Sequence, residues 1–148
     1  DLDLGRVSFS SADPVQKVVD FHAAAAPDRP PVDAKEFTRL YFGGSANDPT
    51  GANAMNDQLR AWAQQAVAAR MPEAEMQAEY NRRVARMTSL PLARYGDASL
   101  YGNPSFIALE VASAEGATQV TRYVVVFQDH ALGRTGLEYH VAPDAIRR

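Results

Sequence analysis

The chain contains no cysteine, and this absence excludes disulfide bonds, thiol catalysis and thiolate metal sites. The cellular compartment stays open, because a chain without thiols suits oxidising and reducing surroundings alike. Of its fifteen basic residues only Lys17 and Lys35 are lysines, and its formal net charge is -3. A chain of this charge has no positive field to attract a polyanion, so we expect no binding to nucleic acid.

Long apolar runs and the familiar catalytic motifs are also missing. No apolar run approaches the roughly 20 residues that a helix needs to span a bilayer. There is no glycine-rich phosphate loop and no serine nucleophile elbow, and the three histidines have none of the spacings typical of zinc sites. We therefore expect no membrane span, no metal ion and no cofactor.

The start of the chain, at Asp1, has the composition of a flexible leader. We place this leader at residues 1–12, ahead of a single domain at 13–148, since the length of 148 residues suits one domain. A processed precursor begins in this way, and so does an arbitrary chain boundary. The leader composition and a bias to arginine and alanine, which is typical of bacterial proteins, together favour a periplasmic or secreted bacterial protein. A cytoplasmic protein is the alternative.

Helical periodicity marks four segments in the first ninety residues: 13–26, 33–42, 53–70 and 73–87. Asp13 and Pro14 suit the start of the first segment, and Asp33 with Glu36 resembles a capping box for the second. Pro72 separates the last two, because proline removes a backbone hydrogen bond and clashes with the preceding turn, at a cost of about 3 kcal/mol. Turn formers fill residues 43–51 and predict a surface loop, either functional or a plain connector.

After Pro91 the periodicity changes from 3.6 residues to two. Alternating apolar residues predict strands at 107–111, 120–128 and 137–141, and residues 94–101 form a weaker fourth candidate. Helices followed by strands predict an α+β fold, in which three to four N-terminal helices pack on a C-terminal antiparallel meander of three to four strands.

The strand at 120–128 is apolar on both faces. Alternation assigns Tyr123, Val125 and Phe127 to one face, and it assigns three valines to the other: Val120, Val124 and Val126. Both faces need a cover. We expect helices on one face, and either a curled sheet or a partner molecule on the other.

Groups able to exchange protons are few and scattered along the chain: Asp20, Glu110, Glu138, Tyr139 and His140. Each of them also fits an ordinary helix or strand position. The arginines at 82, 83, 86 and 94 form a basic cluster, which is either the wet face of a helix or a surface for an acidic partner. Trp62 and Tyr80 lie on helical stripes and are expected in the core.

Three aromatic residues gather in a stretch rich in glycine, asparagine and proline, where we expect exposure. Exposed aromatic side chains on an irregular segment are favoured at protein interfaces. We therefore predict that this stretch forms a partner-binding surface made of Arg94, Tyr95, Tyr101 and Phe106.

The order of elements, with 13–21 opening the first helix and 136–141 in the last strand, resembles the nuclear-transport-factor-two-like and cystatin-like superfamily of cone-shaped α+β domains. The long helical stretch at 53–87 departs from that pattern. The resemblance implies a curved sheet around a helix-lined concavity. That scaffold hosts small enzymes and also non-catalytic accessory domains of exported bacterial proteins, so it transfers no catalytic residue.

These observations favour a non-catalytic protein-binding or accessory domain of an exported bacterial protein, such as an inhibitor, an immunity protein or a secretion-system component. The alternative is a small-molecule-binding protein or small enzyme of the cone-shaped class, with pocket residues Asp20, His22 and His140 inside the concavity. The sequence leaves the partner, any substrate and the oligomeric state open.

Overall fold

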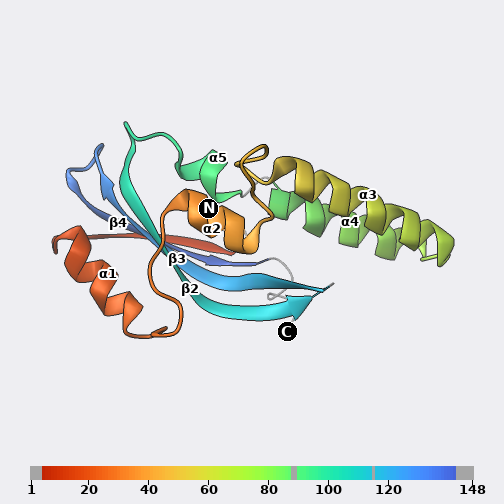
Figure 1. Cartoon of the computed structure of the whole chain (residues 1–148), viewed down its shortest axis with the longest axis horizontal. Coiled ribbons are helices and arrows are strands. Elements are labelled where there is room, and N and C mark those ends of the chain that lie inside the picture. Colours follow the sequence, from red (N-terminus) through yellow and green to blue (C-terminus); the bar gives the residue numbers. More distant parts are fainter. Residues whose placement is uncertain (1–4, 88–89, 115, 143–148) are drawn as a thin grey trace.

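A computed structural model describes residues 5–87, 90–114 and 116–142. Four strands and five helices follow one another in these residues (Figure 1): β1 (Arg6–Ser11), α1 (Val15–Ala23), α2 (Ala34–Tyr41), α3 (Ala52–Ala68), α4 (Glu73–Met87), α5 (Pro91–Tyr95), β2 (Tyr101–Ala114), β3 (Ala117–Asp129) and β4 (Arg134–Val141). The strands form one antiparallel sheet in the order β1-β4-β3-β2. The predicted α+β class is confirmed, with β2, β3 and β4 as the meander.

The first strand of the sheet comes from the N-terminus, where the sequence predicted a flexible leader. Residues Arg6–Ser11 pair with β4 along their whole length. The leader prediction is therefore wrong for residues 6–11, while residues 1–4 lie outside the described part of the chain. Short strands rich in serine carry little local signal, because what holds β1 in place is pairing with a strand about 130 residues further along.

The weaker strand candidate at 94–101 is also wrong. Pro91 begins the short helix α5 there, with the proline in its first turn, where the missing amide costs nothing. The chain then turns, and β2 begins only at Tyr101. The end of α5 and the turn after it thus stand where the weaker strand candidate was expected.

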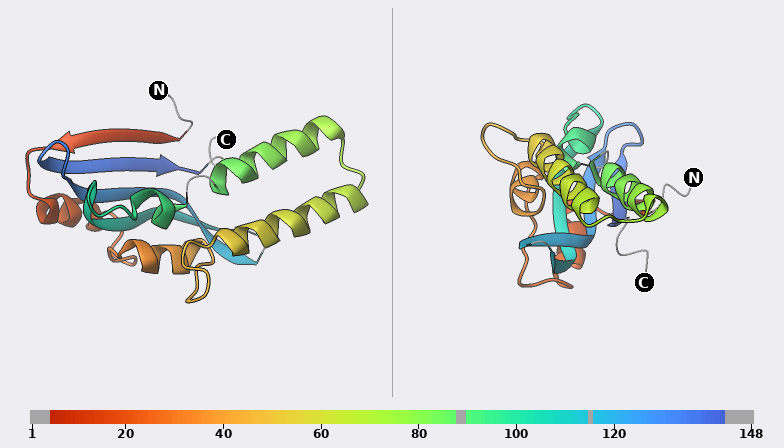
Figure 2. Two further views of the ribbon diagram at one scale, coloured as in Figure 1. Left: turned by 90° about the horizontal axis from the view of Figure 1, so that it is seen from above. Right: turned by 90° about the vertical axis from the view of Figure 1, so that its right-hand side faces the viewer.

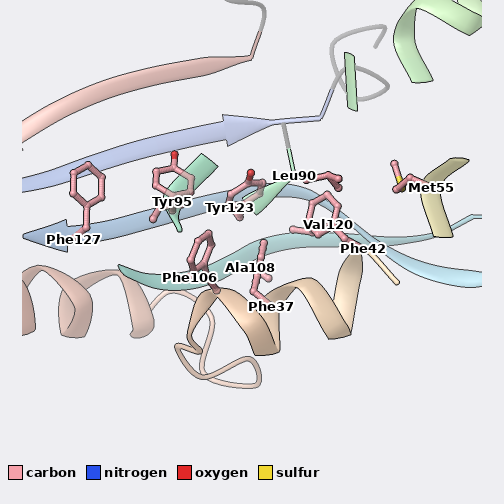
Figure 3. Packing of buried hydrophobic residues seen from close by; sticks show 12 residues of the cluster. Phe37, Phe42, Met55, Leu90, Tyr95, Phe106, Ala108, Val120, Tyr123 and Phe127 are labelled. Atoms are coloured by element: carbon pink, nitrogen blue, oxygen red, sulfur yellow. The ribbon is translucent and has the colours of Figure 1, made fainter. Parts of the chain in front are cut away.

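Helices cover both faces of the central strand β3 (Figures 1 and 2). On one face, Val124 and Val126 pack with Val18 and Val19 of α1. On the other face, the aromatic side chains of β2 and β3 pack under α2 and α5, and Figure 3 shows this cluster around Phe37. The second cover is therefore made of the domain's own helices, and the expectation of a curled sheet or a partner over β3 is wrong.

A β-bulge places Val120 on the other face from the one that alternation predicts. Glu110 pairs with Arg122, whereas the next residue, Val111, pairs with Val120, so β3 has one extra residue at Thr121. An extra residue reverses the alternation of the strand beyond it. Val120 consequently joins the cluster of Phe37 and Tyr123 rather than that of Val124.

Local capping agrees with the sequence at α2 and differs at α1. The Asp33 carboxylate accepts the Glu36 amide at 2.8 Å and caps α2. No side chain of the described residues caps α1, and Asp13 instead pairs with Lys17. The predicted loop at 43–51 is present, and Asp48 within it caps α3 by accepting the amide of Ala54 at 3.0 Å.

Helices α3 and α4 form an antiparallel hairpin, which we call the arm, and the predicted break at Pro72 is confirmed. The arm extends beyond the end of the sheet (Figure 2), and 17 residues of α3 span about 25 Å. Met55 and Met87 tie its base to the core around Phe42. Tyr80, which the sequence placed in the core, is 45% exposed, so that prediction is wrong.

We expect Phe37→Ala to lower the free energy of unfolding by about 3–5 kcal/mol, because Phe37 is fully buried among four other aromatic rings. Phe21→Ala is the matched control, since Phe21 is 76% exposed, and it should change the stability by less than about 0.5 kcal/mol. Urea denaturation measures both. Equal losses would contradict the assignment of the core.

Candidate functional site

A cluster of polar side chains is buried between α5 and β4. Glu138 and His140 point from β4 to the side of the sheet that α5 covers, and both are less than a tenth exposed. The Tyr95 hydroxyl donates a hydrogen bond to Oε2 of Glu138. The same hydroxyl lies 2.6 Å from Nε2 of His140. Arg94 lies at the border of the cluster, and its Nε is 3.4 Å from Oε2 of Glu138.

The hydrogen bonds of Tyr95 determine which nitrogen of His140 carries a proton. Tyr95 has one hydroxyl proton, which goes to Glu138. The phenolic oxygen must therefore accept from Nε2–H of His140. The ring of Tyr123 stacks on that imidazole with centroids 4.5 Å apart, so His140 is held in both position and tautomer.

The surroundings of Glu138 keep its carboxyl ionised. Burial by itself raises the pKa of Glu138. The neighbouring imidazole of His140, with Nε2 at 3.7 Å from Oε2, the hydrogen bond from Tyr95 and the charge of Arg94 outweigh burial and lower the pKa from 4.5 to about 2. Burial and the negative charge of Glu138 raise the pKa of Tyr95, so the phenol stays neutral. Ser8 lies 3.4 Å from the other oxygen of Glu138. The carboxylate is thus a fixed acceptor that joins α5 and β1 to β4.

A cleft of about 530 Å³ opens beside this cluster. Its walls are the start of α2, the end of α5 and the turn before β2, and they include Tyr95 and Tyr101. The volume lies in the range typical of small-molecule sites. Asn103 on its rim has a φ of 43°, a conformation that asparagine adopts more readily than most residues.

The predicted partner-binding residues do not form an exposed surface. Tyr95 is 2% exposed and Phe106 is fully buried, where it stacks on Phe37 with centroids 4.9 Å apart. Their expected exposure is wrong, because α5 and β2 turn these rings inward. Arg94 and Tyr101 remain partly exposed, and the rings of Tyr101 and Tyr95 are in contact.

The predicted pocket residues do not converge either. Asp20 is exposed on α1, where it accepts from Gln16. His22 is buried on the α1 side of the sheet and bonds to the hydroxyl of Tyr139. His140 follows Tyr139 in the strand and so points to the opposite face. The sheet therefore separates the two histidines, and no shared concavity contains all three residues.

Sequence reasoning selected Glu138 and His140 separately but missed their link to Tyr95. The alternation of β4 does place Glu138 and His140 on one face. Nothing local shows that Tyr95 lies above them, because that depends on α5. Among the described residues, no group of three histidine, aspartate or glutamate side chains could hold a metal ion.

No family model, curated protein or solved structure matches this chain. The resemblance to the cone-shaped superfamily therefore stays a prediction. Within the described part of the chain, every helix is too short or too polar to cross a membrane.

We expect Glu138 to make stability depend on pH. Its folded pKa of about 2 lies below the usual 4.5, so its contribution is complete above about pH 5 and is lost as the pH falls toward 2. Urea denaturation of the Glu138→Gln variant should lack this part of the acid destabilisation. Glu110→Gln is the control, because Glu110 pairs with Arg122 at the surface. If Glu138→Gln keeps the full acid dependence of the parent chain, the cluster does not act as described.

Proposed function

We propose that this chain is a non-catalytic protein-binding or accessory domain of an exported bacterial protein, in the class of inhibitors, immunity proteins or secretion-system components. The arm is the observation that carries the proposal. It extends from the sheet as two antiparallel helices that bury little against the rest of the domain (Figure 2). We propose that the arm contacts the partner.

The polar cluster supports a non-catalytic role. A general acid or base near neutral pH needs a pKa close to the working pH, whereas the pKa of Glu138 is lowered to about 2. Both oxygens of that carboxylate already have neighbours in Ser8, Tyr95 and Arg94. The cluster therefore serves the fold, as a link between α5 and the sheet.

The surface of the arm supports binding of a protein. None of the described residues of α4 is buried, and Val67 and Tyr80 are 66% and 45% exposed. Helices gain most of their stability from an apolar face packed on something, and exposed aromatic side chains are favoured at interfaces. A partner that covers Val67 and Tyr80 would supply that packing.

The arginines of α4 favour an apolar contact over an acidic one. Arg82 and Arg83 both pair with Glu79, and Arg83 also lies 4.9 Å over the Trp62 ring. Arg86 donates to Gln119 of β3 at 3.0 Å and lies over Phe42. These cations stabilise the arm and its base, so we expect apolar and aromatic side chains to dominate the interface.

The test compares the parent chain with a Val67→Glu, Tyr80→Glu double variant, each used as bait for proteins of the source organism. The captured partner is then titrated by calorimetry against both baits. Because buried aromatic anchors carry most of the energy of an interface, we expect the arm variant to bind at least about tenfold more weakly.

Leu132→Glu is the matched control for this titration, since Leu132 is 64% exposed in the turn between β3 and β4. It should bind as tightly as the parent chain, and all three proteins should melt at similar temperatures. A partner that binds the arm variant and the parent chain equally would exclude the arm as the interface.

The cleft beside Tyr95 and Tyr101 favours a second function, the binding of a small molecule. Ala98→Trp would fill this cleft, because Ala98 lies in its wall. For a small-molecule protein, we expect compounds that raise the melting temperature of the parent chain, as ligands of the folded state do, but not that of the variant. Compounds that stabilise both proteins equally would contradict a ligand site in the cleft.

A further inference from the structure

The two edges of the sheet differ. The middle of the β2 edge is covered, because Val32 and Phe106 exchange two backbone hydrogen bonds of 3.0 and 2.8 Å. Further along, the Arg29 guanidinium donates to the carbonyls of Ala108 and Leu109 at 3.0 and 3.1 Å. Over residues 106–109, therefore, β2 cannot accept another strand.

The backbone of β1, at the other edge, is open at Ser8 and Ser10. The amide of Val141 donates to Gly5 at 2.6 Å, and the amide of Ala142 donates to Thr121 of β3 at 2.8 Å. In an antiparallel ladder these bonds alternate along the strand. Val7 and Phe9 therefore bond to β4, whereas the amides and carbonyls of Ser8 and Ser10 point outward, and no described residue bonds to them there.

The side chains of β1 do not protect this edge. Val7 is 52% and Phe9 56% exposed, and Phe9 touches only the edge of the Tyr139 ring among the described aromatic residues. Natural edge strands are usually blocked by charged side chains, above all lysine, by proline or by a bulge. Residues 6–11 contain neither lysine nor proline, their one charged residue is Arg6 at the start of the strand, and their pairing with β4 has no register shift.

We propose that β1 pairs with β1 of a second copy of this chain, antiparallel and around a two-fold axis, to form one continuous sheet. Centred on Phe9, this register places Ser8 opposite Ser10 of the other copy. The outward amide of each serine then donates a hydrogen bond to the outward carbonyl of the other. Phe9 then faces Phe9 across a non-hydrogen-bonded position, where side chains lie closest.

The strand is complementary to itself, which is why a second copy is the occupant. Serine meets serine on one face of the new pair and phenylalanine meets phenylalanine on the other, with no like charges opposed at these positions. Aromatic cross-strand pairs stabilise a sheet, and a two-fold contact uses the same patch on both molecules. This pairing is independent of the proposed function, because the dimer uses the edge of β1 whereas the proposed partner contacts the arm.

The first experiment uses cysteine cross-linking, since the parent chain has no cysteine. In the proposed register the two Cα atoms at position 9 lie about 4.5 Å apart, within the range of a disulfide. Mild oxidation should convert Phe9→Cys to a covalent dimer. The control Leu132→Cys, exposed in the turn between β3 and β4, should remain largely monomeric. Equal cross-linking of the two variants would overturn the proposal.

The second experiment keeps Phe9 and measures mass by light scattering. The parent chain should reach twice 16.1 kDa as its concentration rises. Ser10→Pro removes an outward amide without touching the bonds to β4, so it should weaken the dimer by about tenfold or more while changing the melting temperature little. The proposal is overturned if the parent chain stays monomeric or forms a larger oligomer, or if the Ser10→Pro variant dimerises as tightly as the parent chain. A preference of β1 for a strand from another protein would overturn it as well.

Discussion

Strand β3 is apolar on both faces, and the helices of the domain therefore pack on both sides of it. Val124 and Val126 are covered by α1, and Tyr123 and Phe127 by α2 and α5. Each cover is local to the middle of the sheet. Outside it lie β1 at one edge and the arm beyond one end. None of the described residues of β1 and α4 is buried, and exposed apolar side chains there include Val7, Phe9 and Tyr80.

The buried polar cluster is a consequence of the same arrangement. Helix α5 covers β4 with a tyrosine rather than an aliphatic residue, and its hydroxyl needs a partner in the interior. The hydroxyl donates a hydrogen bond to Glu138 and accepts one from His140, so the phenol is used both as donor and as acceptor. A charge held in this way favours one position of α5 on the sheet. It also explains why a carboxylate, a histidine and a tyrosine meet here.

Much of the fold could be predicted from periodicity. The break at Pro72, the cap at Asp33, the meander and the turn before Ala117 depend on residues within a few positions of one another. The prediction was wrong where distant residues decide. Strand β1 exists through pairing with β4, and the weaker strand candidate at 94–101 falls on the end of α5 and the turn that follows it. The candidate site shows the same limit of sequence-based prediction. The sequence indicated Glu138 and His140 as separate candidates, and only the position of α5 in the structure adds Tyr95 to them.

The sequence by itself determined the types of the main elements, their order and the two-sided apolar character of β3, because each of these follows from the local spacing of side chains. Only the tertiary structure decided which helix covers which face, that a bulge at Thr121 moves Val120 to the other side, and that His22 and His140 are separated by the sheet. The physical reason is that a face, an edge or a shared site is defined by residues far apart in the chain. Their contacts form only when the strands pair and the helices pack on both faces of β3.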